Sequence, residues 1–156
     1  MKIEYINPFI EAVTYVMNQF SIQNITIAKN KLAVISEPIK AKGVAAVVGL
    51  TGQLKGRVIY DMSEDTALKI VSKMNGEEFK AFDDMARSTI NELANMITGT
   101  AVTKLTNSGY TFDLTPPSLF TGIEVIITDA MQLKHLVIPI TTECGEMNLN
   151  VALTDK

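Results

Sequence analysis

The sequence contains one cysteine and one histidine in 156 residues. With Cys144 alone, no internal disulfide can form, which favours a cytoplasmic setting. One thiol and one imidazole are also too few for the usual metal-ligand sets, so we expect no metal site in this chain. His135 lies in a predicted strand, where we expect it at the rim of a sheet and not as a catalytic base.

Other absences narrow the function further. The net charge is −3 and no Lys/Arg cluster occurs, which argues against binding to nucleic acid. The longest apolar runs, such as 43–50, have strand length, and the polar start of the chain does not resemble a secretory signal, so we expect neither a membrane span nor export. Because no P-loop, dinucleotide fingerprint or Gly-x-Ser-x-Gly elbow is present, an ordinary enzyme pocket with a cofactor has little support.

What the chain does contain is an alternation of helical and extended segments. Its length predicts one domain, residues 1–156. We expect three main helices, at 8–20, 64–74 and 84–105. The expected strands are 25–28, 32–35, 43–50, 57–60, 110–114, 123–129, 136–142 and 147–153. Because the helices alternate with strand meanders, the predicted fold class is α+β with a largely antiparallel sheet.

Capping residues set the expected helix boundaries. Asn7 followed by Pro8 predicts that the first helix begins at Pro8, with Asn7 as its N-cap. Ser63 is the expected N-cap of the second helix, and Gly76 follows its end. Either aspartate of the pair 83–84 can cap the third helix.

The order helix, meander, helix occurs twice in outline, which indicates a weak internal duplication. Glu4 and Asn7 have the same spacing as Glu92 and Asn95 in the third helix. Since Asn7 is explained as a helix cap, we do not expect the first copy to form a site.

A stripe of small and polar residues runs along the third helix, at Ser88, Glu92, Asn95 and Gly99. At about 100° per residue these positions lie within roughly 60° of arc. The apolar residues of the segment point the opposite way: Ile90, Leu93, Ala94, Ile97 and Ala101. Gly99 costs about 1 kcal/mol of helix stability relative to alanine, and a helix face without a side chain permits close approach of another protein's backbone.

The stripe by itself is compatible with several functions. Most polar stripes are only solvated helix faces, and the spacing of the residues alone does not exclude this interpretation. The carboxamide of Asn95 can both donate and accept a hydrogen bond, so it can orient a water molecule. Phosphoryl transfer depends mainly on positioning, for which an amide suffices. A small-molecule binder is the least supported alternative, because no second polar cluster converges outside the stripe.

The stripe also belongs to a longer motif. Ser88-x-x-x-Glu92-x-x-Asn95-Met-Ile-x-Gly99, followed further along by Pro116-Pro117, resembles the signature of the CheC/CheX/FliY phosphatases of bacterial chemotaxis. A single convincing copy of the motif resembles the CheX type more than the CheC type, which usually carries two. The other segments that look CheX-like are 5–9, 49–56, 64–74, 113–117, 136–139 and 145–153.

This resemblance implies a CheC-like fold and a single CheX-like phosphatase domain that hydrolyses the aspartyl phosphate of CheY, a receiver-domain response regulator. Asn95 would orient the attacking water, and Glu92 would pair with the receiver's active-site lysine. Ser88, Gly99 and Pro117 would contact the partner, with a solvated Ser88 as the alternative. The Mg²⁺ ion would belong to the receiver, so the resemblance implies no cofactor in this chain.

The resemblance further implies a homodimer whose strands join in one sheet. The C-terminal strands, at 123–127, 136–140 and 147–153, are rich in Val, Ile and Leu, and an open edge of this composition would invite uncontrolled pairing. Closed two-fold pairing satisfies such an edge. The competing function is a non-catalytic binding or assembly module of the chemotaxis or flagellar-switch apparatus, since flagellar switch proteins related to this family use the scaffold for assembly.

Overall fold

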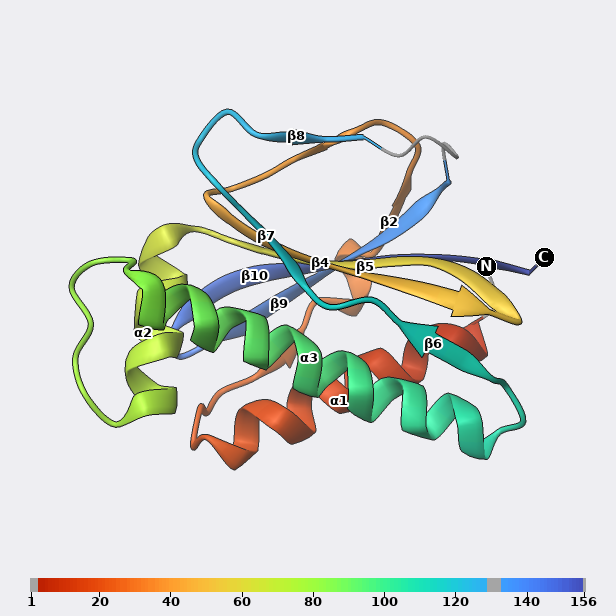
Figure 1. Cartoon of the computed structure of the whole chain (residues 1–156), viewed down its shortest axis with the longest axis horizontal. Coiled ribbons are helices and arrows are strands. Elements are labelled where there is room, and N and C mark those ends of the chain that lie inside the picture. The colour runs from red at the N-terminus through yellow and green to blue at the C-terminus, as the bar shows by residue number, and fades with distance from the viewer. Residues whose placement is uncertain (1–2, 129–132, 156) are drawn as a thin grey trace.

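The computed structural model describes residues 3–128 and 133–155. Its main sheet is covered by three helices on one face and, in part, by a small two-stranded sheet on the other (Figure 1). Each strand pairing in the described part of the chain is antiparallel. The predicted α+β class with a largely antiparallel sheet is therefore confirmed.

The strands fall into two sheets. Those of the main sheet are β1 (Thr26–Ile27), β2 (Ala33–Ile35), β4 (Val44–Gly52), β5 (Leu54–Met62), β6 (Phe112–Leu114), β7 (Ser118–Thr121), β9 (His135–Thr142) and β10 (Gly145–Asp155). Their order is β1-β9-β10-β5-β4-β6, with β2 also paired to β9 and β7 also paired to β4. The small sheet pairs β3 (Ile39–Lys40) with β8 (Ile126–Ile127), and a short 3₁₀ turn, η1 (Lys29–Lys31), precedes β2.

The C-terminal strands do not form an edge of the sheet, so the expectation of an open edge there is wrong. β10 lies between β5 and β9, and β9 is paired on its other side with β1 and β2. Their apolar composition therefore reflects burial inside the sheet, where Ile138, Ile140, Leu149 and Val151 belong to the core. His135, expected at the rim, is only 2% exposed, because Ile35 of β2 pairs alongside it.

The strand predicted at 123–129 is also wrong in extent. Only Ile126–Ile127 is extended and paired, and Ile123 is 84% exposed. Asp129 lies outside the described residues. The apolar composition of this segment fits β8, whose Ile127 packs with the small sheet onto Ala45 and Ile59 of the main sheet.

The helices are α1 (Ile3–Gln19), α2 (Glu64–Asn75) and α3 (Asp84–Asn107). The predicted caps of α2 and α3 are confirmed. Ser63 Oγ accepts a hydrogen bond from the Thr66 amide at 3.1 Å, and Gly76 ends α2 with a φ of 68°. Of the two candidate aspartates it is Asp83 that caps α3, accepting from the Ala86 amide at 2.9 Å. None of the described helices is long and apolar enough to cross a membrane.

The predicted start of the first helix is wrong. α1 begins at Ile3, so Asn7 is not its N-cap and Pro8 lies inside the helix. Proline removes one hydrogen bond from a helix and disfavours the preceding turn. Tyr5 and Ile6 nevertheless belong to the buried core, and we attribute the extra turn to their packing, which the local cap signal cannot report.

Candidate functional site

The helix that carries the stripe is held firmly by its buried face. The residues predicted to point inward, Ile90, Leu93, Ala94, Ile97 and Ala101, are each at most 1% exposed. α3 packs against α1, α2 and β4, and in Figure 1 it runs across the helix-covered face of the sheet. The predicted orientation of the helix is therefore confirmed.

The opposite face of α3 presents the stripe to solvent. Ser88, Glu92 and Asn95 are exposed, and Gly99 is partly exposed. Within the described residues, the side chains of Ser88, Glu92 and Asn95 make no hydrogen bond or ion pair. Their polar atoms are therefore available to groups from another molecule.

No neighbouring group in the described structure requires a glycine at position 99. A Cβ atom placed on it would meet nothing within 4 Å, whereas a Cβ on Gly49 would lie 2.9 Å from Thr115 Cγ2. Alanine in place of Gly99 would stabilise an exposed helix position by about 1 kcal/mol. The glycine therefore leaves a stretch of bare helix backbone beside Asn95 that the fold itself does not use.

The link Pro116-Pro117 joins β6 to β7, and both of these strands contact α3. The link is fixed to β4 by two hydrogen bonds, from the Gly49 amide to Thr115 Oγ1 at 2.8 Å and from the Thr115 amide to the Gly49 carbonyl at 3.0 Å. Pro116 is exposed and Pro117 partly buried. The proline link of the motif therefore connects two strands that both contact α3.

A buried hydrogen bond lies beneath the stripe. Tyr60 of β5 and Thr98 of α3 are joined at 2.6 Å between their hydroxyl oxygens. Thr98 donates its own proton to the Ala94 carbonyl at 2.7 Å, so the Tyr60 hydroxyl is the donor to Thr98. Burial raises the pKa of Tyr60, which stays protonated. Sequence analysis missed this pair, because no local pattern connects two residues 38 positions apart.

The first copy of the Glu-x-x-Asn spacing also lies on one helix, which corrects the reason for setting it aside. Glu4 and Asn7 are both exposed on α1. Tyr110, however, donates its hydroxyl to Glu4 Oε1 at 2.9 Å. One turn after Asn7, Glu11 forms an ion pair with Lys104 at 3.1 Å. In the α1 copy the glutamate is therefore held by a contact within the chain, and so is the residue one turn beyond the asparagine.

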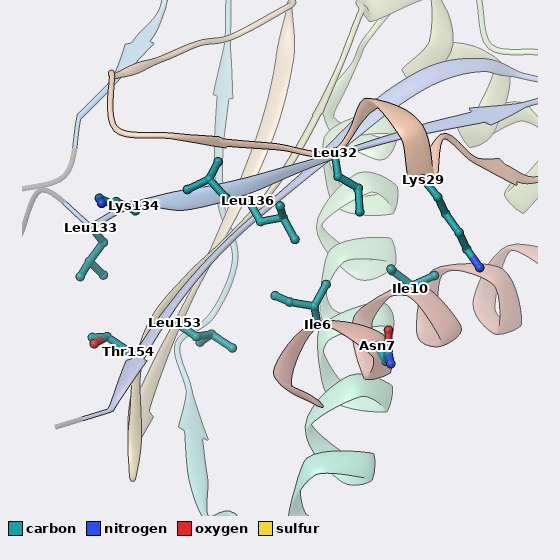
Figure 2. Close-up of a pocket in the computed structure, with 11 residues that line it drawn as sticks. Ile6, Asn7, Ile10, Lys29, Leu32, Leu133, Lys134, Leu136, Leu153 and Thr154 are labelled. Atoms are coloured by element: carbon teal, nitrogen blue, oxygen red, sulfur yellow. The ribbon is translucent and has the colours of Figure 1, made fainter. Parts of the chain in front are cut away.

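A hollow of about 600 Å³ lies away from the stripe, between α1 and the β2–β9–β10 side of the sheet (Figure 2). Its lining is mostly aliphatic, with Lys29 and Lys134 also present. None of the four stripe residues lines it. The aliphatic side chains are Ile6, Ile10, Leu32, Val34, Leu133, Leu136 and Leu153.

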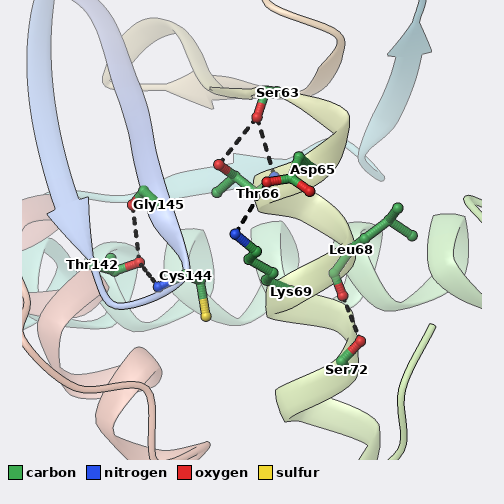
Figure 3. Close-up of polar contacts among 9 residues, drawn as sticks. All are labelled: Ser63, Asp65, Thr66, Leu68, Lys69, Ser72, Thr142, Cys144 and Gly145. Atoms are coloured by element: carbon green, nitrogen blue, oxygen red, sulfur yellow. Dashed lines mark hydrogen bonds and ion pairs between the residues drawn. The ribbon is translucent and has the colours of Figure 1, made fainter. Parts of the chain in front are cut away.

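Cys144 has no features of a nucleophile. It lies in the β9–β10 hairpin, where Thr142 Oγ1 accepts from the Cys144 amide and donates to the Gly145 carbonyl, both at 3.0 Å (Figure 3). Burial raises the pKa of the thiol, which disfavours the reactive thiolate. Within 3–128 and 133–155, no three His, Cys, Asp or Glu side chains cluster as metal ligands.

Both the sequence and the fold of this chain are similar to those of known proteins. Residues 44–141 match the family model of the chemotaxis phosphatase CheX. The CheY-P phosphatase CheX of Thermotoga maritima is 38% identical over 101 residues, which cover 64% of this chain and 65% of that protein. The match therefore spans just under two thirds of that relative.

Two solved structures agree over nearly the whole chain. A CheX–CheY–BeF3–Mg²⁺ complex from Borrelia burgdorferi matches with a TM-score of 0.76 and 32% identity, covering 99% of this chain and 100% of the other. A CheC-like superfamily protein from Shewanella has the same fold, with a TM-score of 0.88, 24% identity and 99% of each chain covered. The fold is thus that of the CheC-like superfamily, and the chain belongs to the CheX family of chemotaxis phosphatases.

Proposed function

We propose that this chain hydrolyses the aspartyl phosphate of a CheY-like receiver domain, with α3 laid against the receiver's active site. The observation that carries the proposal is the combination of unpaired Glu92 and Asn95 with the bare backbone at Gly99. Membership of the CheX family supports it, as does the Borrelia burgdorferi relative that was solved with CheY and BeF3.

In this proposal Asn95 orients the attacking water. Its carboxamide oxygen accepts a hydrogen bond from the water, and its Nδ2 can donate to a phosphoryl oxygen. The water oxygen bonds to phosphorus on the side opposite the aspartyl oxygen. The bond between phosphorus and that oxygen then breaks, and its electron pair remains on the aspartate as a carboxylate. Both protons of the water leave with inorganic phosphate, one on the oxygen of the new phosphorus–oxygen bond and one on a phosphoryl oxygen, so the amide need not titrate.

The remaining stripe residues would hold the receiver. Glu92, one turn before Asn95, would pair with a lysine of the receiver that otherwise contacts the phosphoryl group. Gly99 would admit the receiver's backbone, while Ser88 and Pro117 would border the contact. The receiver would supply its own Mg²⁺, which neutralises charge on the phosphoryl oxygens, so this chain needs to bring no cofactor.

The test is a phosphate-release assay with a purified, phosphorylated CheY-like receiver. We expect release to accelerate in proportion to added chain and to depend on Asn95. Tight binding of the beryllofluoride form without acceleration would favour the alternative, a non-catalytic binding or assembly module. If no receiver of the source organism binds the chain and none loses its phosphate faster in its presence, the proposal is overturned.

Association into a homodimer through sheet pairing remains a proposal, now at a different edge. β2 pairs with β9 on one side only within the described strands, and Val34 in β2 and Leu32 just before it are exposed. Both side chains also line the aliphatic hollow of Figure 2. Light scattering at micromolar concentration tests the idea, with Val34→Lys expected to give monomers. A wild-type monomer would refute the dimer without affecting the proposed phosphatase activity.

A further inference from the structure

The contact between α3 and the sheet is mostly non-directional. The buried side chains of the helix are small or aliphatic, among them Ala86, Ala94, Ala101 and Ile97. Apolar packing of this kind depends on the area removed from water and has no preferred direction, whereas a hydrogen bond fixes the relative position of two atoms. Tyr60 and Thr98 supply the one side-chain hydrogen bond that joins α3 to the main sheet in the described part of the chain.

This bond acts on the helical turn that carries the proposed catalytic amide. Thr98 follows Asn95 by three positions and directly precedes Gly99. It is fully buried, and Tyr60 is 1% exposed, so water cannot readily replace either partner. The bond therefore restrains both rotation of α3 about its axis and sliding of α3 along β5.

A small rotation would suffice to disturb catalysis. Side chains extend about 5–6 Å from the axis of an α-helix, so a rotation of about 10° moves their tips by about 1 Å. A displacement of about 1 Å between reacting groups can reduce a rate by about 10²-fold. Orienting a water is therefore far more sensitive to the rotation of α3 than is the overall stability of the domain.

We propose that Tyr60 and Thr98 are positioning residues that set the rotation of α3 and so align the Asn95 carboxamide with the receiver's phosphoryl group. The inference rests on the proposed phosphatase function. It adds a buried pair of residues, which does not contact the receiver, to the exposed residues proposed to act in phosphate release. The other buried threonine bond of α3, from Asn75 Nδ2 to Thr89 Oγ1 at 3.0 Å, joins α3 to α2 and not to the sheet.

The first test compares variants that lose the hydroxyl with one that keeps it. We expect Tyr60→Phe and Thr98→Val to lower kcat for phosphate release by about tenfold, while Kd for the beryllofluoride receiver changes by less than about twofold. Thr98→Ser, which retains the hydroxyl, should restore kcat. Tyr110→Phe is the matched control, because it also removes a hydrogen-bonded tyrosine hydroxyl, here one that donates to Glu4 at 2.9 Å, and should leave kcat unchanged.

A second readout does not require activity. The side-chain amide resonance of Asn95 should shift or broaden in Tyr60→Phe and Thr98→Val, and stay as in the wild type in Thr98→Ser and Tyr110→Phe. If the wild-type chain releases no phosphate, the proposed function fails and the Asn95 resonance alone decides whether the pair orients this residue. Wild-type kcat with an unchanged Asn95 resonance in folded Thr98→Val would overturn the positioning role. If Tyr60→Phe does not fold, the Thr98 variants give the answer.

Discussion

Two helices of this protein carry the same Glu-x-x-Asn spacing on an exposed face, but only on α3 does the glutamate lack a hydrogen-bond partner within the described residues. On α3, the side chains of Glu92 and Asn95 make no hydrogen bond or ion pair within the described residues. On α1, Glu4 accepts the hydroxyl of Tyr110. The position one turn beyond the asparagine is Gly99 on α3 and Glu11 on α1, where the carboxylate pairs with Lys104.

The comparison shows that residue spacing does not define a site without access. α1 and α3 pack against each other on the same face of the sheet, so a common position in the fold cannot explain the difference (Figure 1). The difference lies in which polar atoms already have partners and in whether a side chain covers the backbone. The predictions that follow compare corresponding positions on the two helices.

The largest expected difference is between Asn95→Ala and Asn7→Ala. Loss of the water-orienting amide should slow phosphate release by about 10²-fold or more, while Asn7→Ala should leave the rate unchanged. Because Asn95 is exposed, its replacement should change the free energy of unfolding by less than about 0.5 kcal/mol. Phosphate-release assays and urea denaturation of both variants check this. Near-normal release by folded Asn95→Ala would assign the stripe to binding alone.

A smaller difference is expected between Glu92→Gln and Glu4→Gln. If Glu92 pairs with a receiver lysine, Glu92→Gln should weaken the affinity by about tenfold at low salt and by less at high salt, since ions screen the wild-type attraction. Glu4→Gln should change neither the affinity nor its salt dependence. Titrations of the beryllofluoride receiver at two ionic strengths measure both. If the affinity of Glu92→Gln depends on ionic strength in the same way as that of the wild type, Glu92 does not pair with the receiver.

Gly99→Ala should separate stability from binding. We expect the free energy of unfolding to rise by up to about 1 kcal/mol, because alanine is the better helix former. The affinity for the receiver should fall by a few fold, because the new methyl group stands where the partner's backbone would approach. Glu11→Ala, which removes only a surface ion pair, should change stability by at most about 1 kcal/mol and affinity not at all. Unchanged affinity in Gly99→Ala would remove Gly99 from the interface.

The smallest expected effect concerns the hydrogen bond from Tyr110 to Glu4 of α1. Hydrogen bonding to Tyr5 and Glu4 raises the pKa of Tyr110 to about 12 from its ordinary 10.0. The folded state therefore holds this proton more tightly than the unfolded state, and the associated stability is present below about pH 10 and is lost as the pH rises through about 12. Urea denaturation of wild type and Tyr110→Phe at pH 8 and pH 11.5 should show a smaller difference at the higher pH. A difference independent of pH would contradict the assignment.

Sequence predicted α3 well because its signals are local. An aspartate cap, an apolar period and a polar stripe all lie within one continuous segment, so the helix, its buried face and its exposed residues could be inferred together. The start of α1 could not, because burial of Tyr5 and Ile6 depends on strands and helices distant in the chain. The same limit applies to Tyr60 and Thr98, which meet only after β5 and α3 have packed.

The order of the strands in the sheet could not be predicted from the sequence either. The Val- and Ile-rich C-terminal segments have the composition of strands, but composition does not distinguish a central strand from an edge. Only the pairing of β10 with β5 and of β9 with β1 and β2 shows that these segments lie inside the sheet. The roles of the stripe residues remain predictions, because they depend on a second protein.

The central place of β10 has a consequence for how the protein is made. β5 (Leu54–Met62) and β10 (Gly145–Asp155) are neighbours in the sheet but far apart in the chain. A ribosome adding about 5–20 residues per second completes β5 and α3 several seconds before β10 leaves the exit tunnel. The long-range pairing also predicts folding in milliseconds to seconds, which is slow for a domain of this size. We therefore expect nascent chains that end before residue 145 to expose the apolar strands and to need chaperones, and to acquire a receiver-binding α3 only after β10 has inserted.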